Sequence, residues 1–174
     1  MKKTLFTILV IPALLLMAMP SYSKTNAMED AIAKTSRKIS HSQDIPSDAK
    51  FIFTDFRETA SGKKMNLGFA IEDELCISLI REMPGRLAVR HEKNQPTEEN
   101  RGTETVFDSL EAMREYAESL HASYIIGGNY YFDKEYATIS VNVIRAEDGM
   151  IIFSERIKIR ISDLSKKLQP SNAD

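Results

Sequence analysis

The chain has 174 residues, 43% hydrophobic and 28% charged, a composition typical of one globular domain that is long enough to bury its own core. Its net charge of −2 gives no general electrostatic reason to expect nucleic-acid binding. Cys76 is the only cysteine, which excludes an internal disulfide. It lies between apolar residues at helical spacing, so we expect a buried, inert thiol, with an intermolecular disulfide as the weaker alternative.

Residues 1–23 have the pattern of a secretory signal peptide. Two lysines precede an apolar run, and small residues follow it. The run is shorter than the ~20 residues of a membrane helix and contains Pro12. Cleavage after Ser23 or after Ala27 fits the pattern, and an uncleaved anchor is the alternative. Because the signal contains no cysteine, we expect no direct lipid anchor.

Two amphipathic helices and a strand are predicted next. Met28, Ile32, Thr35 and Ile39 form one stripe of a helix. Residues 51–56, "FIFTDF", carry little charge and indicate a well-buried strand. In the second helix the apolar residues recur at four-residue spacing, whereas three consecutive acids are expected to face water. The apolar stripe is Leu67, Ile71, Leu75 and Leu79, and the acids are Glu72, Asp73 and Glu74.

The remaining elements complete a single α/β domain. Residues 86–91 predict a short strand, 92–105 a mobile loop, and 108–122 a third helix. Three strands follow, and Asp148-Gly149 is a strong hairpin signal between the last two. We therefore predict a mixed, mainly parallel sheet packed by helices. Its order is strand-helix-strand-helix-strand plus a C-terminal antiparallel hairpin. The domain spans 28–162, and 163–174 is a flexible tail.

No convincing active site emerges from the side chains. His41, His91 and His121 occupy separate contexts without metal-ligand spacing, so no metal or other cofactor is expected. Asp55, at the end of the first strand, is the one acid where α/β folds place functional groups, although a cap or turn role is favoured. The protein is expected not to be an enzyme. A small-molecule-binding domain around Asp55 is the alternative.

The last three strands carry the candidate partner-binding residues. Gly127-Gly128 lies inside a strand and lacks the spacing of a phosphate-binding loop, so a bulge or a close backbone approach is favoured. Most of the tyrosines are expected to pack the sheet, and one or two to anchor a partner. A basic row on the last strand is expected to protect the edge from aggregation, and docking to an anionic partner or envelope surface is the alternative. The candidate residues are Tyr130, Tyr131, Arg156, Lys158 and Arg160.

Four segments resemble the FlgO family of secreted flagellar accessory proteins. They are "FIFTDF", "LGFAIEDEL", "SLEAMREYAESLHASYIIGGNYYF" and "ISVNVIRAEDGMIIFS". The family is related in fold to the curli secretion component CsgG and to periplasmic activators of penicillin-binding proteins. Members of these groups are often lipoproteins, and this chain departs from them because it has no lipid-accepting cysteine in its signal.

The resemblance implies a periplasmic or outer-membrane-associated protein that supports flagellum assembly, stability or motility through protein-protein binding. Its expected partners are envelope or flagellar basal-structure proteins, and its oligomeric state is left open. The alternative is a periplasmic regulator that docks on a cell-wall synthase or a secretion component. The chain has no long amphipathic hairpins that would line a pore, which argues against a CsgG-like channel.

Overall fold

The computed structural model describes residues 27–89 and 110–170, and the predicted signal peptide and mobile loop lie outside these ranges. Helices and strands alternate up to β3, and two further strands follow directly. Their bounds are α1 (Ala27–Ser40), β1 (Phe51–Glu58), α2 (Asn66–Glu82), β2 (Leu87–Val89), α3 (Leu110–Ser119), β3 (Tyr124–Phe132), β4 (Tyr136–Arg145) and β5 (Ile151–Arg160). A short 3₁₀ helix, Ile161–Asp163, comes after β5.

Within the described residues the strands form one five-stranded mixed sheet in the order β2-β1-β3-β4-β5. β1 runs parallel to β2 and to β3, whereas the β3–β4 and β4–β5 pairings are antiparallel. The predicted single mixed α/β domain is present, but the prediction of a mainly parallel sheet is wrong. β2 has only three residues, and the longest pairings belong to strands joined by short turns, which force antiparallel neighbours.

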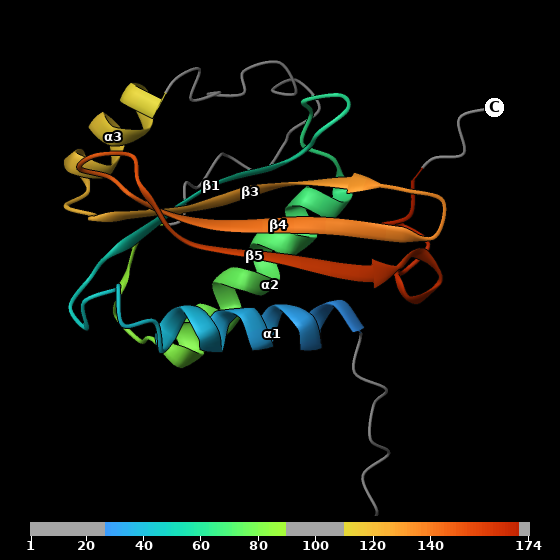
Figure 1. Ribbon diagram of the computed structural model, residues 1–174, viewed down its shortest axis with the longest axis horizontal. Coiled ribbons are helices and arrows are strands. Elements are labelled where there is room, and N and C mark those ends of the chain that lie inside the picture. Colours follow the sequence, from blue (N-terminus) through green and yellow to red (C-terminus); the bar gives the residue numbers. More distant parts are fainter. Residues whose placement is uncertain (1–26, 90–109, 171–174) are drawn as a thin grey trace, which may run out of the picture.

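The helices lie on both faces of this sheet. α1 and α2 lie side by side on one face, and α3 lies on the opposite face near one end (Figure 1). Right-handed crossovers explain the arrangement. The chain moves outward from β1 to β2 through α2, and then back across the sheet to β3 through α3, so the two helices take opposite faces.

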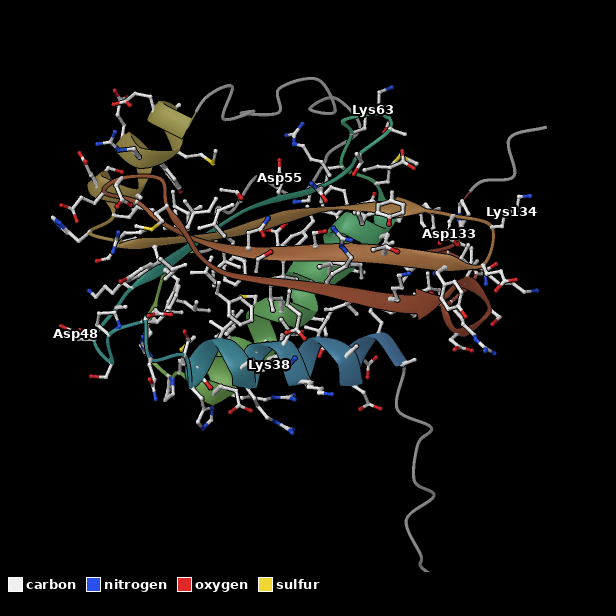
Figure 2. The ribbon with its side chains drawn as sticks, in the orientation of Figure 1. Lys38, Asp48, Asp55, Lys63, Asp133 and Lys134 are labelled. Atoms are coloured by element: carbon white, nitrogen blue, oxygen red, sulfur yellow. The ribbon has the colours of Figure 1, made fainter. Side chains whose placement is uncertain are left out.

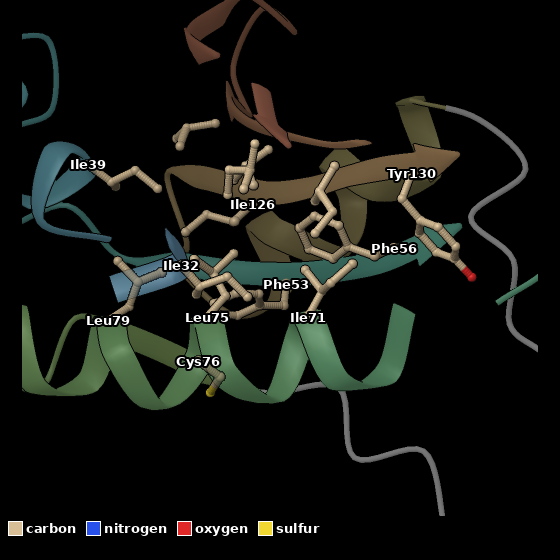
Figure 3. Close-up of a cluster of buried hydrophobic side chains, with 14 of the residues drawn as sticks. Ile32, Ile39, Phe53, Phe56, Ile71, Leu75, Cys76, Leu79, Ile126 and Tyr130 are labelled. Carbon is tan, nitrogen blue, oxygen red and sulfur yellow. The ribbon is translucent and has the colours of Figure 1, made fainter. Parts of the chain in front are cut away.

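The main core fills the space between the sheet and the α1–α2 layer. The predicted stripe on α2 is buried there, as is the stripe on α1 (Figure 3). Phe51, Phe53 and Phe56 of β1 all join this core. Strict alternation would place Phe56 on the other face, but an irregularity in the β1–β3 register between Phe53 and Phe56 returns it to the same side.

A smaller core lies under α3. It contains Ile52, Ala117, Ala122, Ile125 and Ala146. Because α3 has only ten described residues and contacts one end of the sheet, this core covers that end of the face alone. Beyond that end, α3 does not cover the face, and polar side chains can occupy it.

Two glycines in β3 permit close approaches that no side chain would allow. A Cβ at Gly127 would lie 2.0 Å from the side-chain oxygen of Thr54, and one at Gly128 would lie 1.9 Å from the carbonyl oxygen of Ser140. Gly68 has the same role in α2, where a Cβ would meet the carbonyl oxygen of Phe56 at 2.2 Å. The predicted close backbone approach at the glycine pair is therefore confirmed.

The turn between β4 and β5 is the hairpin that Asp148-Gly149 predicted. Gly149 has a φ of +74°, in the left-handed region that favours glycine. The Arg145 guanidinium donates hydrogen bonds to both carboxylate oxygens of Asp148, at 3.0 and 2.6 Å. With a further bond from the Met150 amide, these contacts lower the pKa of Asp148 to about 2.

Part of the segment predicted as a flexible tail packs on the core. Leu164 is buried, and Leu168 packs against the same cluster. The Gln169 side chain donates to the carbonyl oxygens of Ile161 and Leu164, and Asn66 donates to that of Lys167. Over its described part, this segment therefore closes the end of the core near the start of α2.

Candidate functional site

The face of the sheet opposite α1 and α2 carries polar and basic side chains beyond the end that α3 covers. Alternation along the strands determines which residues point there. Because Ala137, Ile139, Val141 and Val143 of β4 enter the main core, their neighbours point to the other side. We call this surface the polar face. It consists of Arg57, Asn129, Tyr131, Thr138, Ser140, Asn142, Ser154, Arg156, Lys158 and Arg160.

The strand register aligns these residues in rows that cross the sheet. One row joins Tyr131, Thr138 and Lys158. The next row joins Arg57, Asn129, Ser140 and Arg156 across four strands. A third row ends in Asn142 and Ser154, whose side chains are hydrogen-bonded at 2.8 Å.

Basic charge concentrates on the β5 side of the polar face. Arg156, Lys158 and Arg160 are all exposed and project from alternate positions of one strand. Over the described ranges, none of the three forms an ion pair with a carboxylate. β5 is the last strand in the described order of the sheet, so this row borders an edge. The local positive charge contrasts with the overall charge of −2.

Four of the five predicted partner-binding residues therefore share one surface, namely Tyr131, Arg156, Lys158 and Arg160. The fifth does not. Tyr130 is fully buried on the α1–α2 side, where its ring lies 5.8 Å from that of Phe132. Consecutive strand residues point to opposite faces, so Tyr130 and Tyr131 cannot both lie on the same surface.

Burial raises the pKa of the Tyr130 phenol above its usual value of 10.0. The folded state therefore holds this proton more tightly than the unfolded chain does. Stability from this group is present below pH 10 and is lost as the pH rises above 10 toward the folded-state value. Chemical unfolding measured at pH 8, 10 and 11 is expected to show a loss above pH 10 that is smaller in Tyr130→Phe. Tyr131→Phe, at the exposed neighbour, is expected to show the full wild-type loss, and a loss reduced as much as in Tyr130→Phe would contradict this assignment.

Asp55 belongs to a network of charges at the side of β1. Its carboxylate accepts hydrogen bonds from Arg57 at 2.8 Å and from Lys64 at 2.9 Å, and Lys64 also bonds to Glu72 (Figure 2 shows Asp55 on β1). Glu72 is 5% exposed, so the prediction that it faces water is wrong. Lys64, which precedes α2 and is itself nearly buried, reaches back to pair with it. A cavity of about 190 Å³ lies beside Asp55.

This network ties the loop after β1 to the sheet. Arg57 also donates to the carbonyl oxygen of Gly62, at 3.1 Å. Both oxygens of the Asp55 carboxylate accept bonds from the protein's own cations. The arrangement fits the turn-holding role that the sequence favoured for Asp55.

The described residues contain neither a metal centre nor a membrane-spanning helix. Across 27–89 and 110–170, no three His, Cys, Asp or Glu side chains converge to hold an ion. His91, one of the three histidines considered, lies outside these ranges. The same ranges contain no helix that combines the length and apolar character needed to cross a membrane. Cys76 is buried, as predicted.

Sequence reasoning missed the polar side chains between the tyrosine and the basic row. Asn129, Ser140, Asn142 and Ser154 reach the polar face from three strands, and each alone is an ordinary strand residue. The signal available was the alternation of polar and apolar residues in β4. Only the register between strands shows that these residues are neighbours.

Comparison with protein-family models gave no match, and comparison with curated protein sequences gave no significant one. Solved structures do match. The C-terminal domain of LpoB from Salmonella enterica aligns with a TM-score of 0.57 and 11% identity, over 76% of this chain and 97% of that domain. The corresponding domain from Escherichia coli gives 0.54 and 12%, over 76% and 97%.

An NMR structure of LpoB from Escherichia coli aligns over 91% of this chain and 82% of its own, with a TM-score of 0.55 and 14% identity. At these identities the likeness concerns the fold. It supports the predicted relation in fold to activators of penicillin-binding proteins. The resemblance to the FlgO family stays a prediction from the sequence.

Proposed function

We propose that this protein is a non-enzymatic protein of the periplasm that acts by binding other envelope proteins, as a regulator of a cell-wall synthase. The observation that carries the proposal is its likeness in fold to LpoB, which extends over almost the whole LpoB C-terminal domain. The N-terminal signal pattern is in keeping with export.

The geometry supports binding rather than catalysis. The one acid singled out by the sequence, Asp55, is held by Arg57 and Lys64. The polar face instead offers an exposed tyrosine and three exposed cations in a fixed register. Tyrosine and arginine are the residue types on which protein interfaces most depend.

The test is an activity assay on purified components. The penicillin-binding proteins of the same organism are assayed for glycan polymerisation and peptide cross-linking, with and without the secreted protein. We expect the secreted protein to bind one of these enzymes and, at saturating concentration, to change the rate of that enzyme. If none binds and none changes its rate, the proposal is wrong.

Swimming in soft agar separates this proposal from the flagellar role that the FlgO resemblance implies. A deletion strain is expected to swim normally and to show altered cell-wall synthesis. Missing or detached filaments with normal cell-wall synthesis would favour the flagellar role and a basal-structure partner.

A further inference from the structure

We infer that the polar face is the docking surface and that its partner is an acidic surface of another protein. This inference rests on the proposed function, since it assigns the surface and the chemistry of the partner that such a regulator would use. Four of the five predicted partner-binding residues lie on this face. The strand register places further polar side chains beside them.

Charge is the first reason for an acidic partner. Arg156, Lys158 and Arg160 project from alternate residues of one strand, so their Cα atoms span about 13 Å at the usual strand rise. None is paired with a carboxylate within the described residues. Two are arginines, which bind carboxylates through two parallel hydrogen bonds. A row of this size matches several carboxylates on one protein surface.

The polar residues beside this row favour a protein surface over a lipid surface. Asn129, Ser140, Asn142 and Ser154 offer donors and acceptors suited to main-chain and side-chain groups. Binding at a bilayer surface relies on apolar side chains that enter the headgroup region, with a larger cluster of basic residues. Among the described residues of the sheet face opposite α1 and α2, the exposed large apolar side chains are Tyr131 and Ile151, and the strand registers place them at opposite ends of the sheet, where they form no apolar cluster.

The polar face also contains a buried hydroxyl without a hydrogen-bond partner among the described residues, that of Thr138. Thr138 is 0% exposed. Its neighbours in register are Tyr131 on one side and Lys158 on the other. A buried hydroxyl without a partner is costly. A bound partner that shifts either neighbouring side chain would gain a hydrogen bond here.

Charge reversal tests the surface on the whole secreted protein. The triple variant Arg156→Glu, Lys158→Glu, Arg160→Glu is compared with Lys34→Glu, Lys166→Glu, Lys167→Glu. The control changes the charge equally at exposed positions away from the polar face. We expect the first triple to weaken binding to the synthase at least 100-fold and the control to change it less than threefold. Equal effects, or no effect of the first triple, would overturn the inference.

A second measurement does not depend on the synthase. An octaglutamate peptide is titrated into the labelled protein at low salt, and amide shifts are mapped by NMR. We expect the shifts to concentrate on β5 and on Asn129 and Tyr131, and to vanish in the first triple variant. Shifts spread equally over α1 and residues 166–167 would overturn the inference. A peptide that maps to the polar face while no synthase binds would contradict the proposed function alone.

Anionic vesicles distinguish the other source of negative charge. Vesicles of phosphatidylglycerol are expected to bind the wild-type protein no more tightly than they bind the first triple variant. Tight binding to vesicles that is lost in the first triple, without binding to an acidic protein, would assign the polar face to a membrane surface and overturn the inference.

Discussion

Replacing Gly128 with alanine is expected to destabilise the fold by about 3 kcal/mol or more. The new Cβ would lie 1.9 Å from the carbonyl oxygen of Ser140 and 2.7 Å from a ring carbon of Phe56. The carbonyl belongs to the backbone of the neighbouring strand, so relief requires β3 and β4 to separate. Urea unfolding followed by circular dichroism measures the loss.

Gly127→Ala provides the matched comparison. Its Cβ would meet the side-chain oxygen of Thr54 at 2.0 Å, but the Thr54 Cβ lies at an ordinary 3.4 Å. Removing that oxygen with Thr54→Ala is therefore expected to restore most of the stability of Gly127→Ala. The same second change is expected to do nothing for Gly128→Ala. Equal rescue of both variants would show that the two glycines are not required for these different reasons.

The hydrophobic pattern was sufficient to predict most of the core. The helical spacing of the stripe residues in α1 and α2 identified the buried stripes, and the Asp148-Gly149 turn identified the last hairpin. These signals are local, since each depends on residues a few positions apart in the chain.

The positions of the β-bulges could not be predicted from the hydrophobic pattern. Strict alternation along β5 would place Ile151 on the same face as Phe153, but Ile151 is 56% exposed. The register between β4 and β5 shifts next to Ile144, which turns Ile151 to the opposite face. The corresponding irregularity in β1 returns Phe56 to the core. Such shifts are set by pairing between strands, which the pattern along one strand does not contain.

Sequence reasoning named four residues of the polar face, but it missed the polar residues beside them and wrongly included Tyr130. If Tyr131 lies on the polar face, the alternation of side chains along a strand places Tyr130 on the other face, and this could have been predicted from the sequence. The alignment of Tyr131 with Lys158 through Thr138 was not, because it depends on two strand registers. The burial of Glu72 was equally hidden, since it depends on how the loop that carries Lys64 folds back.

Replacing Lys64 with methionine is expected to cost about 3 kcal/mol of stability. The Lys64 side chain is 9% exposed and joins Asp55 to Glu72, whose side chains are 18% and 6% exposed. Its ammonium also lies 4.4 Å from the centre of the Phe69 ring. Methionine retains the packing of the stem but removes the positive charge between two carboxylates. The midpoint of urea unfolding measures the change.

Two comparisons separate the buried charge from a general effect of losing a lysine. Lys38→Met removes a lysine that is 49% exposed and paired with Glu155, so it is expected to cost less than about 1 kcal/mol. The double variant Lys64→Met, Glu72→Leu replaces a buried ion pair with apolar groups of similar size. Such exchanges are often close to neutral, so most of the lost stability is expected to return. If the double variant were no more stable than Lys64→Met, the loss would come from packing, and the charge network would not hold the loop to the sheet.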